Sequence, residues 1–311
     1  MGSDLQGRDA AFSSLPTALR ERLRAMAPHW TDDIVENRKQ VLAAYEPVLA
    51  ARPSDGIEIE RDISYGSHER HRLDVYRQAS TKDAPIVAFV HGGAFVRGDK
   101  DVTPRIYGNV PRYFARHRCV GINVEYRLAP EARYPAGAHD VGAAIAWIRA
   151  NAKRCGGNAE RIVLVGHSAG AAHAAAYVGD PAGRTCERHG VAALALIGGR
   201  LRADAHADNP NADAVRAYYG DDTALYETRS VVTHADNFDL PMFLAVAEFE
   251  NPYLDLYMAE FAARVGSRQR RLPRFLQLSG QNHTSMVAHF DAGEELLDRA
   301  LLEFVMDVAS A

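Results

Sequence analysis

The sequence lacks the features that are typical of disulfide-rich, membrane-spanning and secreted proteins. Its three cysteines, Cys119, Cys155 and Cys186, are odd in number and widely spaced over 311 residues, so no disulfide framework is expected. No apolar run reaches the roughly 18 residues that a membrane span needs. The first residues also lack the basic and apolar regions of a secretion signal. We therefore expect a soluble, cytoplasmic protein without a membrane span.

Signatures of charged partners and cofactors are missing as well. The formal net charge is −4, and the arginine-rich segment 268–274 is short and mixed with apolar residues, so nucleic acid is not an expected partner. The glycines lack the spacing of dinucleotide- or phosphate-binding loops. Asp204, His206 and Asp208 lie close together but without the spacing of a zinc site, which favours a solvated loop. The sequence thus predicts no cofactor and no metal.

What the sequence does contain is the pattern of one large α/β domain. Hydrophobic residues make up 47% of the chain, enough for a sizeable core. From residue 86 onward, short apolar runs alternate with helical stretches, which predicts a mostly parallel central sheet of about eight strands with helices on both faces. Before it, Ile57–Ser64 and His71–Arg77 alternate in polarity, as an antiparallel pair at a sheet edge does. We expect this domain to span residues 55–311.

Two segments depart from this regular alternation. Pro16–Ala27 and Asp32–Ala51 have helical spacing and flank Trp30, so residues 1–54 are expected to form an N-terminal helical cap or lid. Simple packing of these helices against the body remains the alternative. Residues 199–239 form a connection longer than usual in such folds, and we expect this insertion to shape a pocket.

The chain is organised around the segment 161–172, which reads as a strand, a tight turn and a helix. Between the apolar strand and the run of small residues lies Gly166-x-Ser168-x-Gly170. Glycines flank a serine in this way when it sits on a sharp turn that leaves its neighbours no room for a Cβ. Ser168 would stand at a helix N-terminus, where free N–H groups such as that of Ala169 can stabilise an oxyanion. The motif occurs once and predicts a nucleophile.

A serine nucleophile needs a base and an acid, which follow it in the chain in this type of turn. His283 comes after the last expected strand in a polar loop and is the predicted base, with His289 as the fallback. The acid should follow the strand near residue 247. Glu250 is the predicted acid because it lies in a turn, while Glu248 and Asp255 remain alternatives.

The sequence also offers a second loop of oxyanion donors. His91-Gly92-Gly93-Ala94-Phe95 directly follows the apolar run 86–90. Two glycines let the backbone pass beneath a substrate carbonyl, so the amides of Gly93 and Ala94 are expected to act together with that of Ala169. Gly92 is a further candidate donor.

Taken together, these motifs resemble the α/β-hydrolase fold, and in particular the hormone-sensitive-lipase-like bacterial carboxylesterases. The resemblance covers roughly residues 55–311, and it implies that the segment Tyr126–Pro135 and Asp140 are structural supports of the oxyanion loop. It implies a carboxylesterase with Ser168 as nucleophile, His283 as base, Glu250 as acid, and Gly93, Ala94 and Ala169 as oxyanion donors. Short-chain or aryl esters would be the substrates.

Departures from that pattern leave other activities open. Ala94 stands where a third glycine is usual and Glu250 where aspartate is usual, and these variations are similar to arylformamidase-like hydrolases. An amidase or arylformamidase on the same triad is therefore the first alternative, and a non-catalytic binding protein of the same fold is the second. The expected partner is a small-molecule ester, and a homodimer is left open. The residues proposed to line the pocket are apolar or aromatic: Trp30, Phe95, Tyr218, Tyr219 and Met286.

Overall fold

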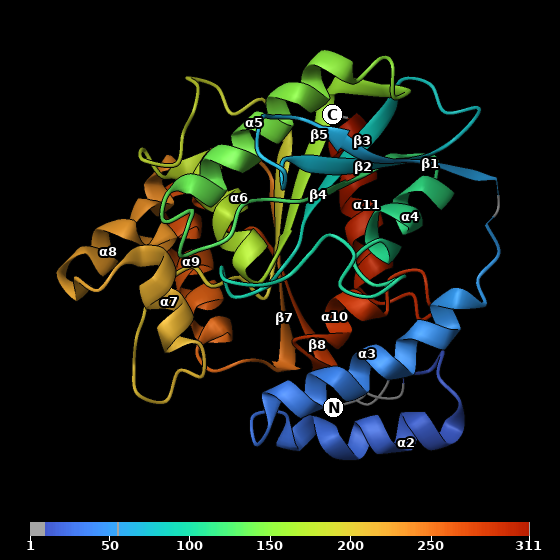
Figure 1. The fold of residues 1–311 in the computed structure, drawn as a ribbon, viewed down its shortest axis with the longest axis horizontal. Coiled ribbons are helices and arrows are strands. Elements are labelled where there is room, and N and C mark those ends of the chain that lie inside the picture. Colours follow the sequence, from blue (N-terminus) through green and yellow to red (C-terminus); the bar gives the residue numbers. More distant parts are fainter. Residues whose placement is uncertain (1–9, 55, 311) are drawn as a thin grey trace.

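The computed structural model describes residues 10–54 and 56–310, and predictions about residues 1–9 fall outside this part of the chain. Within it, an eight-stranded sheet has the order β1-β2-β4-β3-β5-β6-β7-β8 (Figure 1). The strands are β1 Ile57–Ser64, β2 Arg72–Gln78, β3 Ala84–Val90, β4 Val120–Val124, β5 Gly157–His167, β6 Ala193–Ile197, β7 Met242–Phe249 and β8 Arg274–Asn282.

The pairing of these strands confirms the mostly parallel sheet predicted from the sequence. β1 pairs antiparallel with β2 and β2 antiparallel with β4, which places the two strands of alternating polarity at one edge. All further pairs, from β4 through β8, are parallel. Parallel strands need crossover connections, and the helices that lie between them in sequence supply these.

Helices cover both faces of the sheet because its central strands carry apolar side chains on both faces. In β3, Ile86 and Ala88 point into one core cluster, while Val87 and Phe89 point into the other. The first cluster includes residues of α5 Ala136–Asn151, α6 Ala169–Gly179 and α9 Leu254–Gln269. The second includes residues of α4 Asn109–Arg116, α10 Ser285–Ala288 and α11 Leu297–Ser310. Burial on both faces explains why the strands read as unbroken apolar runs.

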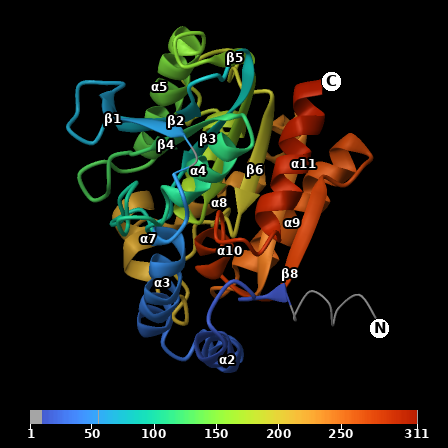
Figure 2. The ribbon, with the colours of Figure 1, turned by 90° about the vertical axis from the view of Figure 1, so that its right-hand side faces the viewer.

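The two N-terminal helices, α2 Thr17–Met26 and α3 Ile34–Ala50, join the second core cluster through Leu23, Val41 and Tyr45. Both views show α2 and α3 side by side at one end of the molecule, near α10 (Figures 1 and 2). Trp30 lies between them with a buried side chain, and its Nε1–H donates to Asn251 Oδ1 at 2.9 Å. The N-terminal helices are thereby attached to the turn after β7.

The predicted insertion contains short helices only. They are α7 Ala212–Tyr219, α8 Tyr226–Arg229 and two 3-10 turns, η2 Thr223–Leu225 and η3 Val231–Asn237. Among residues 10–54 and 56–310, no helix combines the length and the hydropathy needed to cross a bilayer.

Candidate active site

Ser168 occupies the turn between β5 and α6, in the strand-turn-helix context that the sequence predicts. Its φ of 57° lies in the left-handed region, which is strained for a residue with a side chain. The turn is tight enough that a Cβ at Gly170 would lie 2.2 Å from the Val90 carbonyl oxygen. The Ser168 N–H donates to the Ile197 carbonyl at 2.9 Å, so the end of β6 fixes the turn from the other side.

The loop after β3 lies directly against Ser168. A Cβ at Gly92 would lie 2.9 Å from Ser168 Cβ, so only a glycine backbone fits there. The next residues turn sharply, with positive φ at Gly93 and Ala94, and the Gly93 carbonyl accepts a hydrogen bond from the Arg97 N–H at 3.1 Å. The structure thus brings the predicted oxyanion loop to the serine, while Ala169 follows Ser168 as the first residue of α6.

His283 and Glu250 meet at the carboxyl ends of the last two strands. His283 Nδ1 makes a short contact with Glu250 Oε1, and both side chains are buried. The same carboxylate accepts backbone N–H groups from Asn251 at 2.8 Å and Ala247 at 3.3 Å. With Nδ1 bound to a carboxylate, the free nitrogen of the ring is Nε2.

Two neighbours hold this pair close to the serine turn. Gly198, the residue after β6, has a φ of 51°, and a Cβ there would lie 2.9 Å from His283 Nδ1 and 3.0 Å from Glu250 Oε2. His167 Nε2 lies 3.1 Å from the His283 carbonyl oxygen, to which it can donate. Burial, followed by the nearby charge of His283, holds the pKa of His167 well below its usual range. A neutral His167 suits this role as a hydrogen-bond donor.

The other candidates for base and acid have different partners. His289 is fully buried, and its two ring nitrogens bind the Ser285 carbonyl oxygen at 2.9 Å and the Leu297 N–H at 3.2 Å. Glu248 Oε2 accepts the Gly280 N–H at 2.7 Å. Asp255 lies in the first turn of α9. Among the described contacts, only Glu250 of the three carboxylates reaches His283.

A cavity of about 450 Å³ opens over these residues. Of the side chains and loops predicted for the site, Ser168, His283, Gly93, Ala94 and Trp30 line it. This volume suits a small organic ligand. A larger depression of about 1120 Å³ lies around Arg149 and Cys186, and none of the predicted site residues belongs to its described lining.

Three of the predicted pocket residues instead form an aromatic cluster beside the cavity. Phe95 stacks on Tyr218 with ring centroids 4.6 Å apart and meets Tyr219 edge-on at 5.4 Å. All three side chains are buried, and none is among the described lining residues. The rings hold α7 against the oxyanion loop, because aromatic surface is better buried against other rings than left open to the cavity.

The sequence predicts that Met286 lines the cavity, but Met286 is a core residue instead. It lies in α10, one turn beyond His283, and its side chain is fully buried within the second core cluster. Helix geometry turns Met286 inward, while Thr284, next to His283, faces the cavity.

Sequence reasoning missed several residues that the structure brings to the cavity. α3 contributes Ile34, Val35 and Arg38, the loop after β3 contributes Arg97, and Tyr107 lies beneath them. Ile34 and Arg38 are four residues apart, a spacing that indicates a shared helix face. Nothing local in the sequence indicates that this face meets Arg97.

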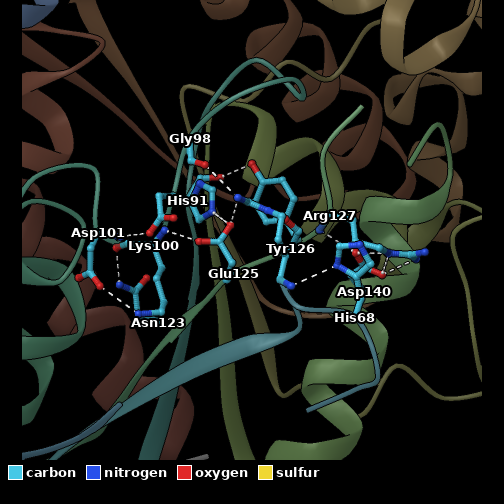
Figure 3. A network of polar contacts seen from close by, with 12 residues as sticks. His68, His91, Gly98, Lys100, Asp101, Asn123, Glu125, Tyr126, Arg127 and Asp140 are labelled. Atoms are coloured by element: carbon cyan, nitrogen blue, oxygen red, sulfur yellow. Dashed lines mark hydrogen bonds and ion pairs between the residues drawn. The ribbon is translucent and has the colours of Figure 1, made fainter. Parts of the chain in front are cut away.

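A buried polar network supports the predicted oxyanion loop (Figure 3). Glu125 accepts a hydrogen bond from the Lys100 N–H at 2.7 Å, lies 3.1 Å from His91 Nε2 and pairs with Arg70. The Tyr126 hydroxyl donates to the His91 carbonyl at 2.9 Å. These contacts fix the residue that immediately precedes the glycines.

The segment after Tyr126 supports the loop in a second way. Arg127 binds Asp140 through its side chain at 2.6 Å and through its backbone N–H at 2.9 Å (Figure 3). Two residues on, the Ala129 N–H donates to the Phe95 carbonyl at 2.9 Å. The loop that carries Gly93 and Ala94 is therefore held at both its ends.

The ionisation of Glu125 predicts how stability depends on pH. Burial alone would raise the pKa of Glu125, but His91, Arg70 and the Lys100 N–H together lower it below the usual range of a glutamate. A lowered pKa in the folded state means that Glu125 stabilises the fold above the usual glutamate pKa, and that this contribution is lost as the pH falls through the folded pKa. We expect denaturant midpoints to fall below about pH 4.5.

Glu125→Gln is expected to flatten this acid dependence and to lower the free energy of unfolding at neutral pH by about 3 kcal/mol, because it leaves the Arg70 guanidinium without its buried carboxylate. Urea unfolding between pH 3 and pH 7 measures both effects. Glu58→Gln is the control, since Glu58 is half-exposed on β1 and lies 3.7 Å from Arg77. An acid dependence that is the same in wild type and Glu125→Gln would contradict the assignment.

Comparison with known proteins extends the resemblance seen in the sequence. The BD-FAE family profile matches residues 73–184. Esterase LipC of Mycobacterium tuberculosis (strain ATCC 25618 / H37Rv) is 39% identical over 112 residues, which are 35% of this chain and 27% of LipC. The arylesterase of Saccharolobus solfataricus is 31% identical over 129 residues, which are 40% of each chain. The chain thus aligns with between about a quarter and two-fifths of the length of these curated relatives.

Similarity over nearly the whole chain comes from solved structures. The hyperthermophilic esterase of the archaeon Pyrobaculum calidifontis has a TM-score of 0.71 at 23% identity, covering 95% of this chain and 98% of that one. At this identity the likeness establishes the fold. The matched segment 73–184 holds Gly92, Gly93, Ala94 and Ser168, whereas Glu250 and His283 lie beyond it. The chain therefore belongs to the α/β-hydrolase fold, and its segment 73–184 is related to esterases, as the motifs predicted.

Proposed function

We propose that the protein is a carboxylesterase that hydrolyses small esters through an acyl-enzyme on Ser168. The observation that carries this proposal is the His283–Glu250 contact beside a strained serine, with Ser168 and His283 lining one cavity. A nucleophile, a base oriented by a carboxylate, and a glycine loop of N–H donors are the parts that acyl transfer needs. The esterase relatives of segment 73–184 support the same reaction.

In the proposed reaction, Ser168 Oγ attacks the ester carbonyl carbon while His283 Nε2 takes the hydroxyl proton. The N–H groups of Gly93, Ala94 and Ala169 stabilise the negative oxygen of the tetrahedral intermediate. The intermediate collapses when the C–O bond to the alcohol breaks and His283 returns its proton to the departing oxygen. Water, deprotonated by His283, then attacks the acyl-enzyme and releases the acid. Glu250 holds the ring in the tautomer that both steps require.

An amidase or arylformamidase reaction would use the same residues, with an amine as leaving group. The test compares hydrolysis of p-nitrophenyl acetate and p-nitrophenyl butyrate with that of N-formylkynurenine. We expect both esters to be turned over with kcat/KM on the order of 10⁴ M⁻¹s⁻¹ or higher, as is ordinary for enzymes. Turnover of N-formylkynurenine alone would make formamidase the better assignment. Failure of a fluorophosphonate to label the folded protein would favour a non-catalytic binding protein.

Further parts of the proposal concern the setting of the site. Residues 1–54 serve as a cap, since Trp30 and the first turns of α3 form one wall of the cavity. The insertion 199–239 contributes Pro210 and Asn211 to the lining of the cavity. The catalytic domain is 55–311, and the enzyme works in the cytoplasm. Association of two chains stays a prediction from the sequence, which size-exclusion chromatography can test.

A further inference from the structure

The cavity above Ser168 carries positive charge that no carboxylate in its lining balances. Arg38 and Lys39 of α3 and Arg97 of the loop after β3 contribute to its wall. No aspartate or glutamate is among the described residues that line it. A neutral ester gives no reason for this excess, because its carbonyl needs only backbone donors and an apolar pocket.

The two arginines differ from the lysine in their partners. Arg97 donates to the neutral Asn211 Oδ1 at 3.0 Å, and Arg38 interacts with the Tyr107 hydroxyl. Within residues 10–54 and 56–310, neither guanidinium forms an ion pair, whereas Lys39 Nζ lies 3.5 Å from a Glu36 carboxylate oxygen. Each guanidinium has five N–H donors, so both keep donors for an incoming anion.

The two guanidinium groups belong to side chains that line the same cavity. Burial, followed by the charge of Arg38, lowers the pKa of Arg97. Like charges that line one cavity repel, and a bound anion would reduce this repulsion. The arrangement is typical of a site whose occupant is negative.

Arg38 lies near the reacting centre and not at a distant rim. The Tyr107 hydroxyl, with which Arg38 interacts, lies 3.2 Å from the position that a Cβ would take at Gly92, and Ser168 Cβ lies 2.9 Å from the same position. The charge of Arg38 also contributes to the low pKa of His167, after burial and His283. An anion held by Arg38 would thus be part of the molecule that Ser168 attacks.

We propose that the substrate is an ester that carries a carboxylate, and that Arg38 and Arg97 bind this carboxylate while Ser168 attacks the ester carbonyl. The inference rests on the proposed esterase function and specifies its substrate class. A planar guanidinium matches a carboxylate with two parallel hydrogen bonds, which makes arginine better suited than lysine to such a site. The carboxylate takes no part in bond breaking: ester and water still give alcohol and acid.

Two pairs of substrates test this class and show which side of the ester bears the charge. On the acyl side, monoethyl succinate is compared with its neutral isostere ethyl isocaproate. On the alcohol side, butanoyloxyacetate is compared with isobutyl butanoate. We expect kcat/KM for the anionic member of one pair to exceed that of its isostere about 10- to 100-fold, the range expected of hydrogen bonds to a charged group. This ratio should fall as salt rises from about 0.05 to 0.5 M.

Variants assign the preference to the two arginines. Arg38→Met and Arg97→Met are each expected to reduce the ratio of kcat/KM for the anionic ester to that for its neutral isostere at least about tenfold. Arg38→Lys is expected to keep part of the preference, because it retains the charge but loses the paired N–H donors of the guanidinium. Arg20→Met is the matched control: it removes a cation from α2 that binds Thr17 and is absent from the cavity lining. It should leave the ratio unchanged.

Failure of this inference can be told apart from failure of the esterase proposal. If the neutral esters are hydrolysed as fast as the anionic ones, the carboxylate site is overturned while the esterase proposal holds. The same follows if the preference for the anionic ester survives in both Arg38→Met and Arg97→Met. If no ester is hydrolysed, titration calorimetry with succinate tests the site directly. Binding that weakens at least about tenfold in Arg38→Met supports it, and undetectable binding at millimolar succinate overturns it.

Discussion

Ser168→Ala is expected to lower kcat for p-nitrophenyl butyrate by about 10⁶-fold, the size of effect known for removal of a nucleophile that acts as a unit with its base. The residual rate would come from the oxyanion donors and from substrate binding alone. The same variant should no longer be labelled by a fluorophosphonate, because the reagent forms its covalent bond with the activated serine oxygen. Steady-state kinetics and mass spectrometry of the labelled protein measure the two effects.

A matched control separates loss of the nucleophile from general damage. Ser267→Ala removes another hydroxyl, one that is exposed on α9 and donates to the Ala263 carbonyl at 2.9 Å. It should keep full activity and full labelling. Ser168→Ala should also fold normally, because it keeps the Cβ and the backbone N–H that donates to the Ile197 carbonyl. More than about 1% of the wild-type rate in Ser168→Ala would overturn the assignment of the nucleophile.

Glu250→Gln is expected to fold normally and to lose about 10³- to 10⁴-fold in kcat. The amide can still accept one of the backbone N–H groups that bind the carboxylate, those of Asn251 and Ala247, so the turn should persist. It can also present its own N–H group to His283 Nδ1, which would favour the tautomer with the proton on Nε2. A ring in that state cannot accept the serine proton.

The neighbouring carboxylates are the controls for this prediction. Glu248→Gln keeps an oxygen that can accept the Gly280 N–H, and Asp255→Asn alters the first turn of α9, so both should lose far less than Glu250→Gln. Circular dichroism establishes that all three variants are folded before their kinetics are compared. If Asp255→Asn were the variant with the large loss of kcat, the acid would be misassigned, while Ser168 and His283 would keep their proposed roles.

The parts of this site that sequence reasoning located depend on local geometry. The serine turn follows from two glycines between an apolar run and a run of small residues, and a parallel sheet brings the carboxyl ends of its strands to one edge. Glu250 and His283 each come directly after such a strand, so their meeting follows from the order of elements. The sheet edge formed by β1 and β2 was predictable for the same reason, from alternation within each strand.

The wall of the cavity depends on packing between distant segments, so the composition of a segment does not predict which residues line the cavity. Aromatic character indicated that Phe95 and Tyr218 would line a pocket, but their rings bury each other. Arg38 and Arg97 lie on a helix and a loop 59 positions apart, and no periodicity within either segment shows that they meet. Their charge alone reads as ordinary solvated surface. Only the placement of α3 across the open end of the sheet brings the two together.

The division of the site between early and late strands has a consequence for biosynthesis. Ser168 follows β5, but its proposed base follows β8, and the hydrogen bond from His167 to the His283 carbonyl joins residues 116 positions apart. At about 5–20 residues per second, a ribosome needs roughly 6 to 23 s to make that interval. Throughout it, the nascent chain contains Ser168 without the imidazole that is proposed to activate it. Unfinished chains that are still attached to the ribosome should therefore not be acylated at this serine.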